Sequence, residues 1–196
     1  MIDSSRMAAV DRNATALGVP AAKLMENAGN AVARDVFSLV DPPAEVAVVA
    51  GRGNNGGDAF VAARHLVEFD VTVYLLGRPG EIRSDVSREN WNVLQHAEIE
   101  TVVVRDSTAF DIGSPDVIID GVLGTGVTGD PRDPARTAIR SINAADAQVV
   151  AVDVPSGVDV DTGAVMDPAV EADRVVTFHD MKPGLAGRED VAVANI

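Results

Sequence analysis

The chain has 196 residues, enough for one large domain with a substantial core, and its apolar fraction of 46% excludes a disordered chain. Its formal net charge is −14, and a protein with this surplus of acid repels polyanions, which argues against nucleic-acid binding. The sequence has no cysteine, which excludes disulfides, thiol catalysis and thiolate metal sites.

Two helices are predicted at the start of the chain. Apolar residues recur at helical spacing from Met7 to Leu17, and Gly18 ends this segment. Pro20 opens a second helix, which the sequence DPP at 41–43 ends. The buried stripe of this second helix is expected to comprise four apolar residues, namely Leu24, Ala28, Ala31 and Val32.

The N-terminal segment also indicates where in the cell the protein is located. Residues 1–12 carry charges and contain no apolar stretch as long as that of a signal peptide. No run in the chain approaches the about 18 consecutive apolar residues of a membrane span. We therefore expect a cytoplasmic protein that does not bind a membrane.

From residue 45 onward, runs of Val and Ile alternate with amphipathic segments. Strands are predicted at 45–51, 71–77, 99–104, 116–124, 148–155, 174–179 and 191–196. Helices are predicted at 58–69, 84–97 and 134–145, and the second of these is expected to bury Val86, Val93 and Leu94. Uninterrupted apolar strands between helices indicate an α/β fold with a doubly wound, mostly parallel sheet covered on both faces. No linker or repeat is evident, so we expect a single domain over 1–196.

The stretch GRGNNGGDAF, at 51–60, follows the first predicted strand. Three of its glycines spell G-x-G-x-x-G, and the pair Gly56 and Gly57 is expected to bring backbone N–H groups close to an anion at the start of a helix. An ordinary nicotinamide-binding loop has small residues where this chain has Asn54, Asn55 and Asp58. These side-chain oxygens therefore indicate a loop of another kind.

The end of the next strand supports that interpretation. A nicotinamide-binding protein usually has an acidic residue there to hold the adenosine ribose, and this chain has Gly77 and Arg78 instead. Arg78 either meets a 2′-phosphate or is an ordinary solvated loop residue. The first loop is thus a poor match to the usual dinucleotide fingerprint.

Two further strand ends carry unusual polar residues. The stretch DGVLGTGVTGD, at 120–130, begins with Asp120 inside an apolar run, where a carboxylate needs a cation or several hydrogen-bond donors. The stretch DVPSGVD, at 153–159, directs Asp153 and Ser156 away from the end of its strand. Each stretch alone is also compatible with local capping of backbone N–H groups.

Taken together, the three loops supply a set of oxygen donors from Asn55, Asp120 and Ser156. Hard cations prefer such donors, and a set with a single carboxylate suits a monovalent ion such as potassium better than zinc. Asp58 and Asp153 remain as candidates for acid–base chemistry or for ribose binding.

Four stretches in this order, at 24–29, 51–66, 120–130 and 151–159, resemble the YjeF N-terminal domain family. These proteins are NAD(P)H-hydrate, or NAD(P)HX, epimerases, and their eukaryotic relatives include the apolipoprotein A-I-binding protein. The resemblance covers nearly the whole chain. It implies a Rossmann-like three-layer α/β/α sandwich with N-terminal helices.

The resemblance also implies an activity, which is interconversion of the R and S epimers of hydrated NADH and NADPH. These damaged cofactors carry a hydroxyl at C6 of the reduced nicotinamide ring. A homodimer is expected, together with a dehydratase that repairs the S form. In microbial relatives this dehydratase is often a fused second domain, which the present chain does not contain.

Matched position by position, the family's functional residues fall on the same three loops. Its potassium ligands fall on Asn55, Asp120 and Ser156, and a further substrate contact falls on Asp153. The two substrate-binding loops fall on Asn54, Asn55, Gly56, Gly57 and Asp58, and on Gly124, Thr125, Gly126, Val127, Thr128, Gly129 and Asp130. Arg52 often corresponds to Pro in the family, and the segment 182–196 looks shortened, so no role is assigned beyond His179.

The position of the hydroxyl suggests a mechanism. The hydroxyl-bearing carbon is bonded to the ring nitrogen, whose lone pair can expel hydroxide to give a planar iminium. Water that returns to the other face then completes the inversion. We expect a carboxylate to move the proton, with Asp153 as the first choice and Asp58 as the second.

Other interpretations stay open. An oxidoreductase that uses an intact nicotinamide cofactor is disfavoured by the first loop, and a non-catalytic binding module is disfavoured by the complete set of polar residues. Of the three histidines, His65 is expected to be a packed helix residue, His96 ends a helix, and only His179 is a candidate for the site. The basic residues are nearly all Arg, since Lys23 and Lys182 are the two lysines, which suits a halophile's surface or simply an acidic protein from a GC-rich genome.

Overall fold

Seven parallel strands form one sheet in the order β3-β2-β1-β4-β5-β6-β7 in the computed structural model, which describes residues 1–127 and 129–196. All six strand pairings are parallel. The strands are β1 (Glu45–Ala50), β2 (Asp70–Leu76), β3 (Glu100–Val104), β4 (Val117–Gly121), β5 (Gln148–Val152), β6 (Arg174–Phe178) and β7 (Val191–Ala194). The seven predicted strands are thus confirmed, with ends shifted by a few residues at most.

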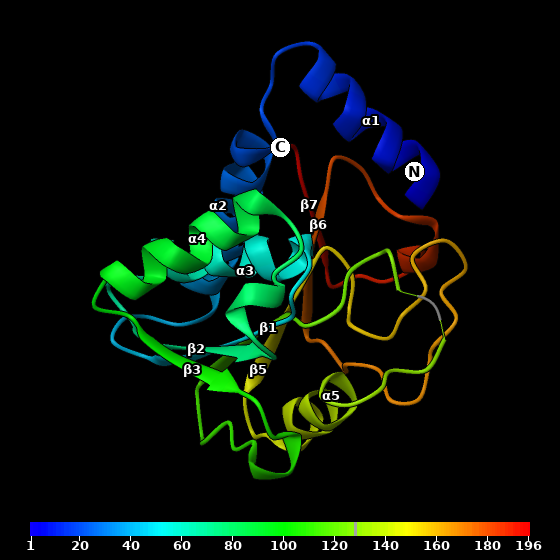
Figure 1. The fold of residues 1–196 in the computed structure, drawn as a ribbon. Helices are drawn as coiled ribbons and strands as arrows, with labels where there is room; N and C mark the ends of the chain where they lie inside the picture. The colour runs from blue at the N-terminus through cyan, green and yellow to red at the C-terminus, as the bar shows by residue number, and fades with distance from the viewer. Residues whose placement is uncertain (128) are drawn as a thin grey trace.

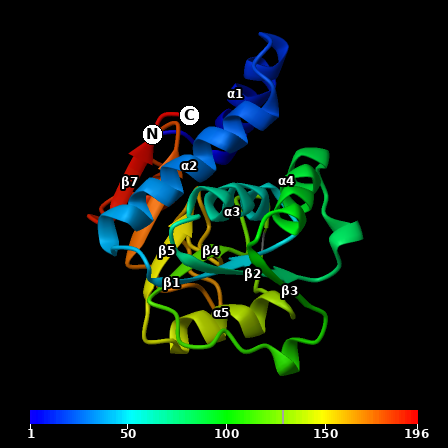
Figure 2. The same cartoon turned by 90° about the vertical axis from the view of Figure 1, so that its left-hand side faces the viewer.

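Helices cover both faces of this sheet (Figures 1 and 2). The α-helices in the described part of the chain are α1 (Ser4–Ala16), α2 (Ala21–Leu39), α3 (Asn54–His65), α4 (Asp85–His96) and α5 (Ala135–Ala144). Figure 2 shows α2, α3 and α4 on one face and α5 on the other. The three-layer α/β/α sandwich is therefore confirmed.

Burial on both faces explains why the central strands are apolar throughout their length. In β1, Val46 and Val48 pack into the core beneath α2, α3 and α4, whereas Ala47 and Val49 pack into the core beneath α5. Both faces of the strand are buried, so the polar alternation of a half-exposed strand is absent. The sheet reverses its direction of growth between β1 and β4, which places a topological switch point at their carboxyl ends.

The predicted stripe of α2 needs correction. Leu24 and Ala31 are only half-buried, and the buried residues of α2 are Met25, Ala28, Gly29, Val32, Ala33 and Val36. The reason is the close approach of α3, because a Cβ at Gly29 would lie 2.4 Å from the Cβ of Val61. The helix turns its small residues toward α3, and Leu24 contributes to a surface cleft instead.

The predicted buried face of α4 is also wrong in part. Its buried residues are Ser87, Trp91 and Leu94, whereas Val86 is half-buried and the side chain of Val93 is 47% exposed. The ring of Trp91 packs on Phe60 of α3 with centroids 5.4 Å apart, and this aromatic contact fixes the rotation of the helix.

The N-terminal helix α1 differs from the other α-helices in its burial. It contains no buried residue. Its first turn is attached to the far end of the chain, because the Ser4 hydroxyl donates to Asp161 at 2.5 Å and the Ile2 N–H donates to the Met181 carbonyl at 2.9 Å. None of the helices described in the structure has the length and the apolar character needed to cross a membrane.

Candidate active site

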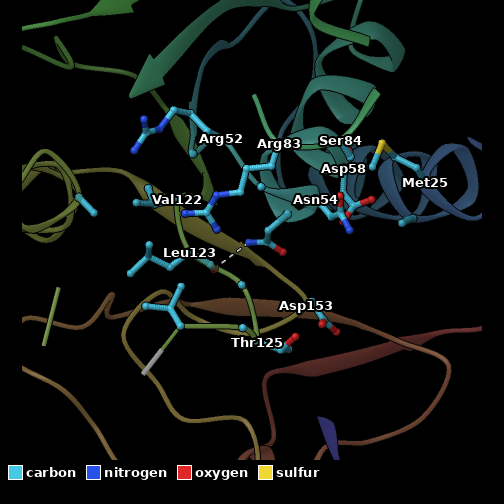
Figure 3. Close-up of a pocket in the computed structure, with 18 of the residues that line it drawn as sticks. Met25, Arg52, Asn54, Asp58, Arg83, Ser84, Val122, Leu123, Thr125 and Asp153 are labelled. Atoms are coloured by element: carbon cyan, nitrogen blue, oxygen red, sulfur yellow. Dashed lines mark hydrogen bonds between the residues drawn. The ribbon is translucent and has the colours of Figure 1, made fainter. Parts of the chain in front are cut away.

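The three polar loops identified in the sequence meet at one edge of the sheet. The register pairs Ala50 with Gly121 and Asp120 with Ala151, so β1, β4 and β5 end side by side. A cleft of about 1110 Å³ opens above these ends, which is as large as the upper range of about 300–1,000 Å³ for small-molecule pockets (Figure 3). Met7, Asp11 and Thr15 of α1 form part of its wall.

The first loop contributes its polar side chains to the cleft, whereas its adjacent glycines Gly56 and Gly57 serve packing. Asn54, Asn55 and Asp58 line the cleft. Gly56 and Gly57 are buried behind them, because a Cβ at Gly56 would lie 2.1 Å from the Gly51 carbonyl oxygen and one at Gly57 would lie 2.3 Å from Ser87 Oγ. α3 accordingly begins at Asn54, four residues before the predicted start, and the contact of Gly56 and Gly57 with an anion stays a prediction.

The second loop also lies at the cleft. Gly124, Thr125, Gly126, Val127, Gly129 and Asp130 line it, and Thr128 is outside the described residues. Three arginines, Arg52, Arg83 and Arg132, line the cleft as well, and Figure 3 labels the first two of them. Arg78 is exposed and is not among the lining residues, which agrees with an ordinary solvated loop arginine.

Asn55, Asp120 and Ser156 come together around Leu123. The Asn55 Nδ2 donates to the Leu123 carbonyl at 2.9 Å, and the Leu123 N–H donates to Ser156 Oγ at 2.8 Å. The Ser156 hydroxyl donates to Asp120 Oδ1 at 2.6 Å, and the Ser156 N–H donates to Asp120 Oδ2 at 2.8 Å. The predicted oxygen set is therefore one local cluster drawn from three loops.

Asp120 carries a buried charge that has only neutral partners. Its side chain is 0% exposed, and burial raises its pKa to about 6, although the hydrogen bonds from Ser156 and Val122 act in the opposite direction. Among the described residues, no Lys, Arg or His forms an ion pair with it. An uncompensated buried carboxylate beside the oxygens of Asn55, Leu123 and Ser156 fits a cation site.

Asp153 lies in a different setting at the end of β5. Its backbone adopts φ 63°, in the left-handed region that is unusual for a residue other than glycine. Its Oδ1 accepts hydrogen bonds from Lys182 Nζ at 2.9 Å, from the Thr177 hydroxyl at 3.0 Å and from the Phe178 N–H at 3.2 Å. Asp153 lines the cleft, and Lys182 lies beneath it, fully buried.

Lys182 was missed by the sequence analysis, which assigned no role beyond His179. One signal was present, because a chain that uses Arg for all but two of its 16 basic residues has a lysine shortly after the end of a strand. The chain folds back after β6, and the ion pair joins residues 29 positions apart. Neither motif nor periodicity could have indicated that contact.

Asp58 is the second acid of the cleft, and its environment differs from that of Asp153. Burial is the main cause that holds its pKa well above the ordinary range, and the negative charges of Asp153 and Asp11 act in the same direction. Figure 3 shows Asp58 on α3 and Asp153 below it after β5. One cleft thus contains one carboxyl group that favours its protonated form and one that is paired with an ammonium.

His65 and His96 lie where the sequence analysis expected them, whereas the role of His179 stays a prediction. His65 ends α3, with Nε2 2.9 Å from Glu26 Oε1, and does not line the cleft; His96 ends α4 with its ring against the Asn92 carbonyl. His179 has φ 64° and lies 3.5 Å from Asp11, close to the cleft.

Comparisons with known proteins give a consistent result. The model of the family described as "YjeF-related protein N-terminus" matches residues 21–184. The chain is 44% identical over 193 residues to the NAD(P)H-hydrate epimerase of Cenarchaeum symbiosum, covering 97% of this chain and 90% of that protein. A crystal structure of the yeast protein ynu0 superposes with a TM-score of 0.85 at 24% identity over 98% of this chain and 86% of that one, which is a likeness of fold.

A longer relative is also similar. The chain is 50% identical over 186 residues to the bifunctional NAD(P)H-hydrate repair enzyme Nnr of Methanothermobacter thermautotrophicus. That match covers 91% of this chain and 36% of the relative, so the chain spans about a third of the length of the bifunctional protein.

Proposed function

The chain belongs to the family of YjeF-related protein N-termini, and from this premise we propose that it is an isomerase that interconverts the R and S epimers of hydrated NADH and NADPH. The observation that carries the proposal is the presence of Asp58 and Asp153 in one cleft with unlike environments. A relative that this chain matches over 90% of the relative's length is named an NAD(P)H-hydrate epimerase, which supports the same activity.

The two carboxyl groups suit inversion at a carbon bonded to nitrogen. As the C6–O bond breaks, the ring nitrogen lone pair forms the C=N bond of the iminium, and protonated Asp58 donates its proton to the leaving oxygen to give water. A water on the other face then bonds to C6, the C=N pair returns to nitrogen, and the Asp153 carboxylate accepts the released proton. General acid–base catalysis of this kind contributes roughly 10²–10⁴-fold in rate.

The site offers cationic groups for the anionic part of such a substrate. Arg52 and Arg83 lie beside the N-terminus of α3, where backbone N–H groups favour negative charge. Arg52 is paired with Glu81, whereas no ion pair of Arg83 is present among the described residues. In a protein with a formal charge of −14, these arginines favour binding of a pyrophosphate at this end of the cleft.

We further propose that Asn55, Asp120 and Ser156 hold a potassium ion, with the Leu123 carbonyl as an additional oxygen nearby. The ion would supply one positive charge that compensates buried Asp120 and fixes the three loops relative to one another. Support comes from the donor set and from the lack of a cationic partner for Asp120 among the residues described.

A chromatographic experiment tests the activity. One epimer of hydrated NADH is purified, the protein is added, and the appearance of the other epimer is followed against the slow unaided equilibration. Accelerated appearance is expected, and a rate equal to that without protein would contradict the proposal and leave a non-catalytic binding module. Formation of reduced cofactor from NAD and assorted alcohols would instead favour an oxidoreductase.

The assembly and location follow as parts of the same proposal. We expect a homodimer that works in the cytoplasm, where reduced nicotinamide cofactors are used, and a separate or fused dehydratase that consumes the S epimer. Exposed apolar side chains near the junction of α1 and α2, such as Leu17 and Val19, favour such a contact. Light scattering after size-exclusion chromatography would test the dimer.

A further inference from the structure

A lysine is fully buried beneath the candidate base Asp153. Lys182 is 0% exposed, and its Nζ donates to Asp153 Oδ1 at 2.9 Å, to Thr177 Oγ1 at 3.0 Å and to the Phe178 carbonyl at 2.7 Å. An ammonium group has three donors, and each has an acceptor here. Lysine is almost never fully buried unless it is paired, so a specific partner accounts for its position.

The shape of this contact favours lysine over arginine. Arg supplies all but two of the 16 basic residues, and the other lysine, Lys23, is exposed on α2. The acceptors of Lys182 surround a single nitrogen, which matches a compact ammonium and does not match the planar fork of a guanidinium. The chain therefore departs from its preference for Arg at the position where only a point charge fits.

The hydrogen bonds divide the Asp153 carboxylate into two unlike oxygens. Oδ1 accepts from Lys182, from the Thr177 hydroxyl and from the Phe178 N–H. In the described part of the chain, no group forms a hydrogen bond to Oδ2, and Asp153 lines the cleft. One oxygen is thus anchored to β6 and the segment after it, and the other remains for a molecule in the cleft.

Two further acidic groups lie near Asp153, which makes the positive charge of Lys182 more important. Asp58 of α3 is close enough to Asp153 for their charges to interact, Asp11 of α1 adds a third acid, and His179 faces Asp11 at 3.5 Å. Among the residues described, Lys182 is the cation that forms an ion pair with Asp153. Without it, the acidic groups around Asp153 would repel one another with no cation beside them.

We propose that Lys182 is a positioning residue that anchors Oδ1 of Asp153, so that Oδ2 faces the cleft and accepts the proton of the water that attacks the substrate. This inference rests on the proposed epimerase function and assigns a role to a residue outside the three loops. Lys182 acts through Asp153 and does not touch the substrate. Thr177 supports the same arrangement, because its hydroxyl accepts from Lys182 and donates to Asp153.

The test compares Lys182→Met with Lys23→Met, which removes the other lysine from an exposed position. For Lys182→Met we expect a loss in kcat of roughly 10²-fold with KM changed only a few-fold, because a proton-transfer group is affected and substrate contacts are kept. Lys182→Arg should restore kcat only in part, because a guanidinium does not match acceptors that surround a single nitrogen, and Lys23→Met should match the wild type.

The possible outcomes separate the two proposals. An inactive wild-type protein would contradict the epimerase function, whereas a folded, fully active Lys182→Met variant beside an active wild type would contradict only the role of Lys182. Should Lys182→Met fail to fold, Thr177→Val replaces it, because this change removes one donor to Asp153 at nearly constant volume. A loss in kcat of about tenfold is then expected, and wild-type kcat would overturn the proposal.

Discussion

Asp120 and Asp153 are the same residue type at the ends of neighbouring strands, yet the partners of their carboxylates differ in charge. Asp120 is 0% exposed and bonds only neutral donors, whereas Asp153 is 8% exposed and has an ammonium beneath it. A carboxylate that already has a cationic partner can act in chemistry at the surface of a cleft. A buried carboxylate that has none is suited to an ion from solution.

Among the substitutions that test this difference between Asp120 and Asp153, the largest effect is expected at Asp153. Asp153→Asn removes the proposed proton acceptor, so kcat should fall by roughly 10²–10⁴-fold while the affinity for the hydrated cofactor changes little. Rates of epimerisation and equilibrium binding of the purified epimer measure the two quantities. Unchanged kcat would remove Asp153 from the mechanism.

The next effect concerns stability at Asp120. Burial raises its pKa to about 6 in the folded protein, above the ordinary 3.8 of an aspartate, so the folded state binds this proton more tightly. In buffer with a bulky organic cation, this contribution is fully present below about pH 4 and is lost as the pH rises through about 6, amounting to roughly 3 kcal/mol. Potassium should reduce the loss at pH 7, as thermal unfolding would show.

Two variants decide whether that pH dependence belongs to Asp120. Asp120→Asn should lack both the loss of stability between pH 4 and 6 and the response to potassium, because no charge is buried. Asp153→Asn should keep both. Equal responses to potassium in all three proteins would contradict the proposed ion site.

A smaller effect is expected from the packing that brings the loops after β1 and β4 together. Gly51→Ala places a Cβ 2.1 Å from the Val122 carbonyl oxygen, so the loop beside Asp120 must shift, at a cost of about 1–3 kcal/mol in the free energy of unfolding. The matched control is Gly53→Ala, where a Cβ meets nothing within 4 Å. Denaturant unfolding measures both, and equal midpoints would contradict this account.

The contrast also shows which parts of the site could be predicted from the sequence. Asn55, Asp120 and Ser156 follow three apolar strands, and parallel strands end at one edge, so their convergence could be inferred from order along the chain. Lys182 could not be found in this way, because its contact with Asp153 depends on how the chain returns after β6. The side chain is held by a backbone carbonyl and by two other side chains, which leave no periodic signal.

The helices could likewise be predicted only in part from the sequence. Their existence followed from apolar spacing, but their rotation did not. Gly29 and Trp91 set which faces of α2 and α4 are buried, the first through the absence of a side chain and the second through an aromatic contact with Phe60. Spacing alone favoured the larger aliphatic residues Leu24 and Val93, whereas packing against α3 favoured their neighbours.

The helix α1 has a consequence for how the molecule could be dissected. It adds no buried side chain, yet Met7, Asp11 and Thr15 belong to the wall of the cleft. Cleavage of the exposed junction at 17–20, followed by release of the fragment that Ser4 and Ile2 hold in place, should therefore leave the seven-stranded sheet with most of its resistance to heat while it opens the cleft on one side. Catalysis and folding would then be separable by the removal of one helix.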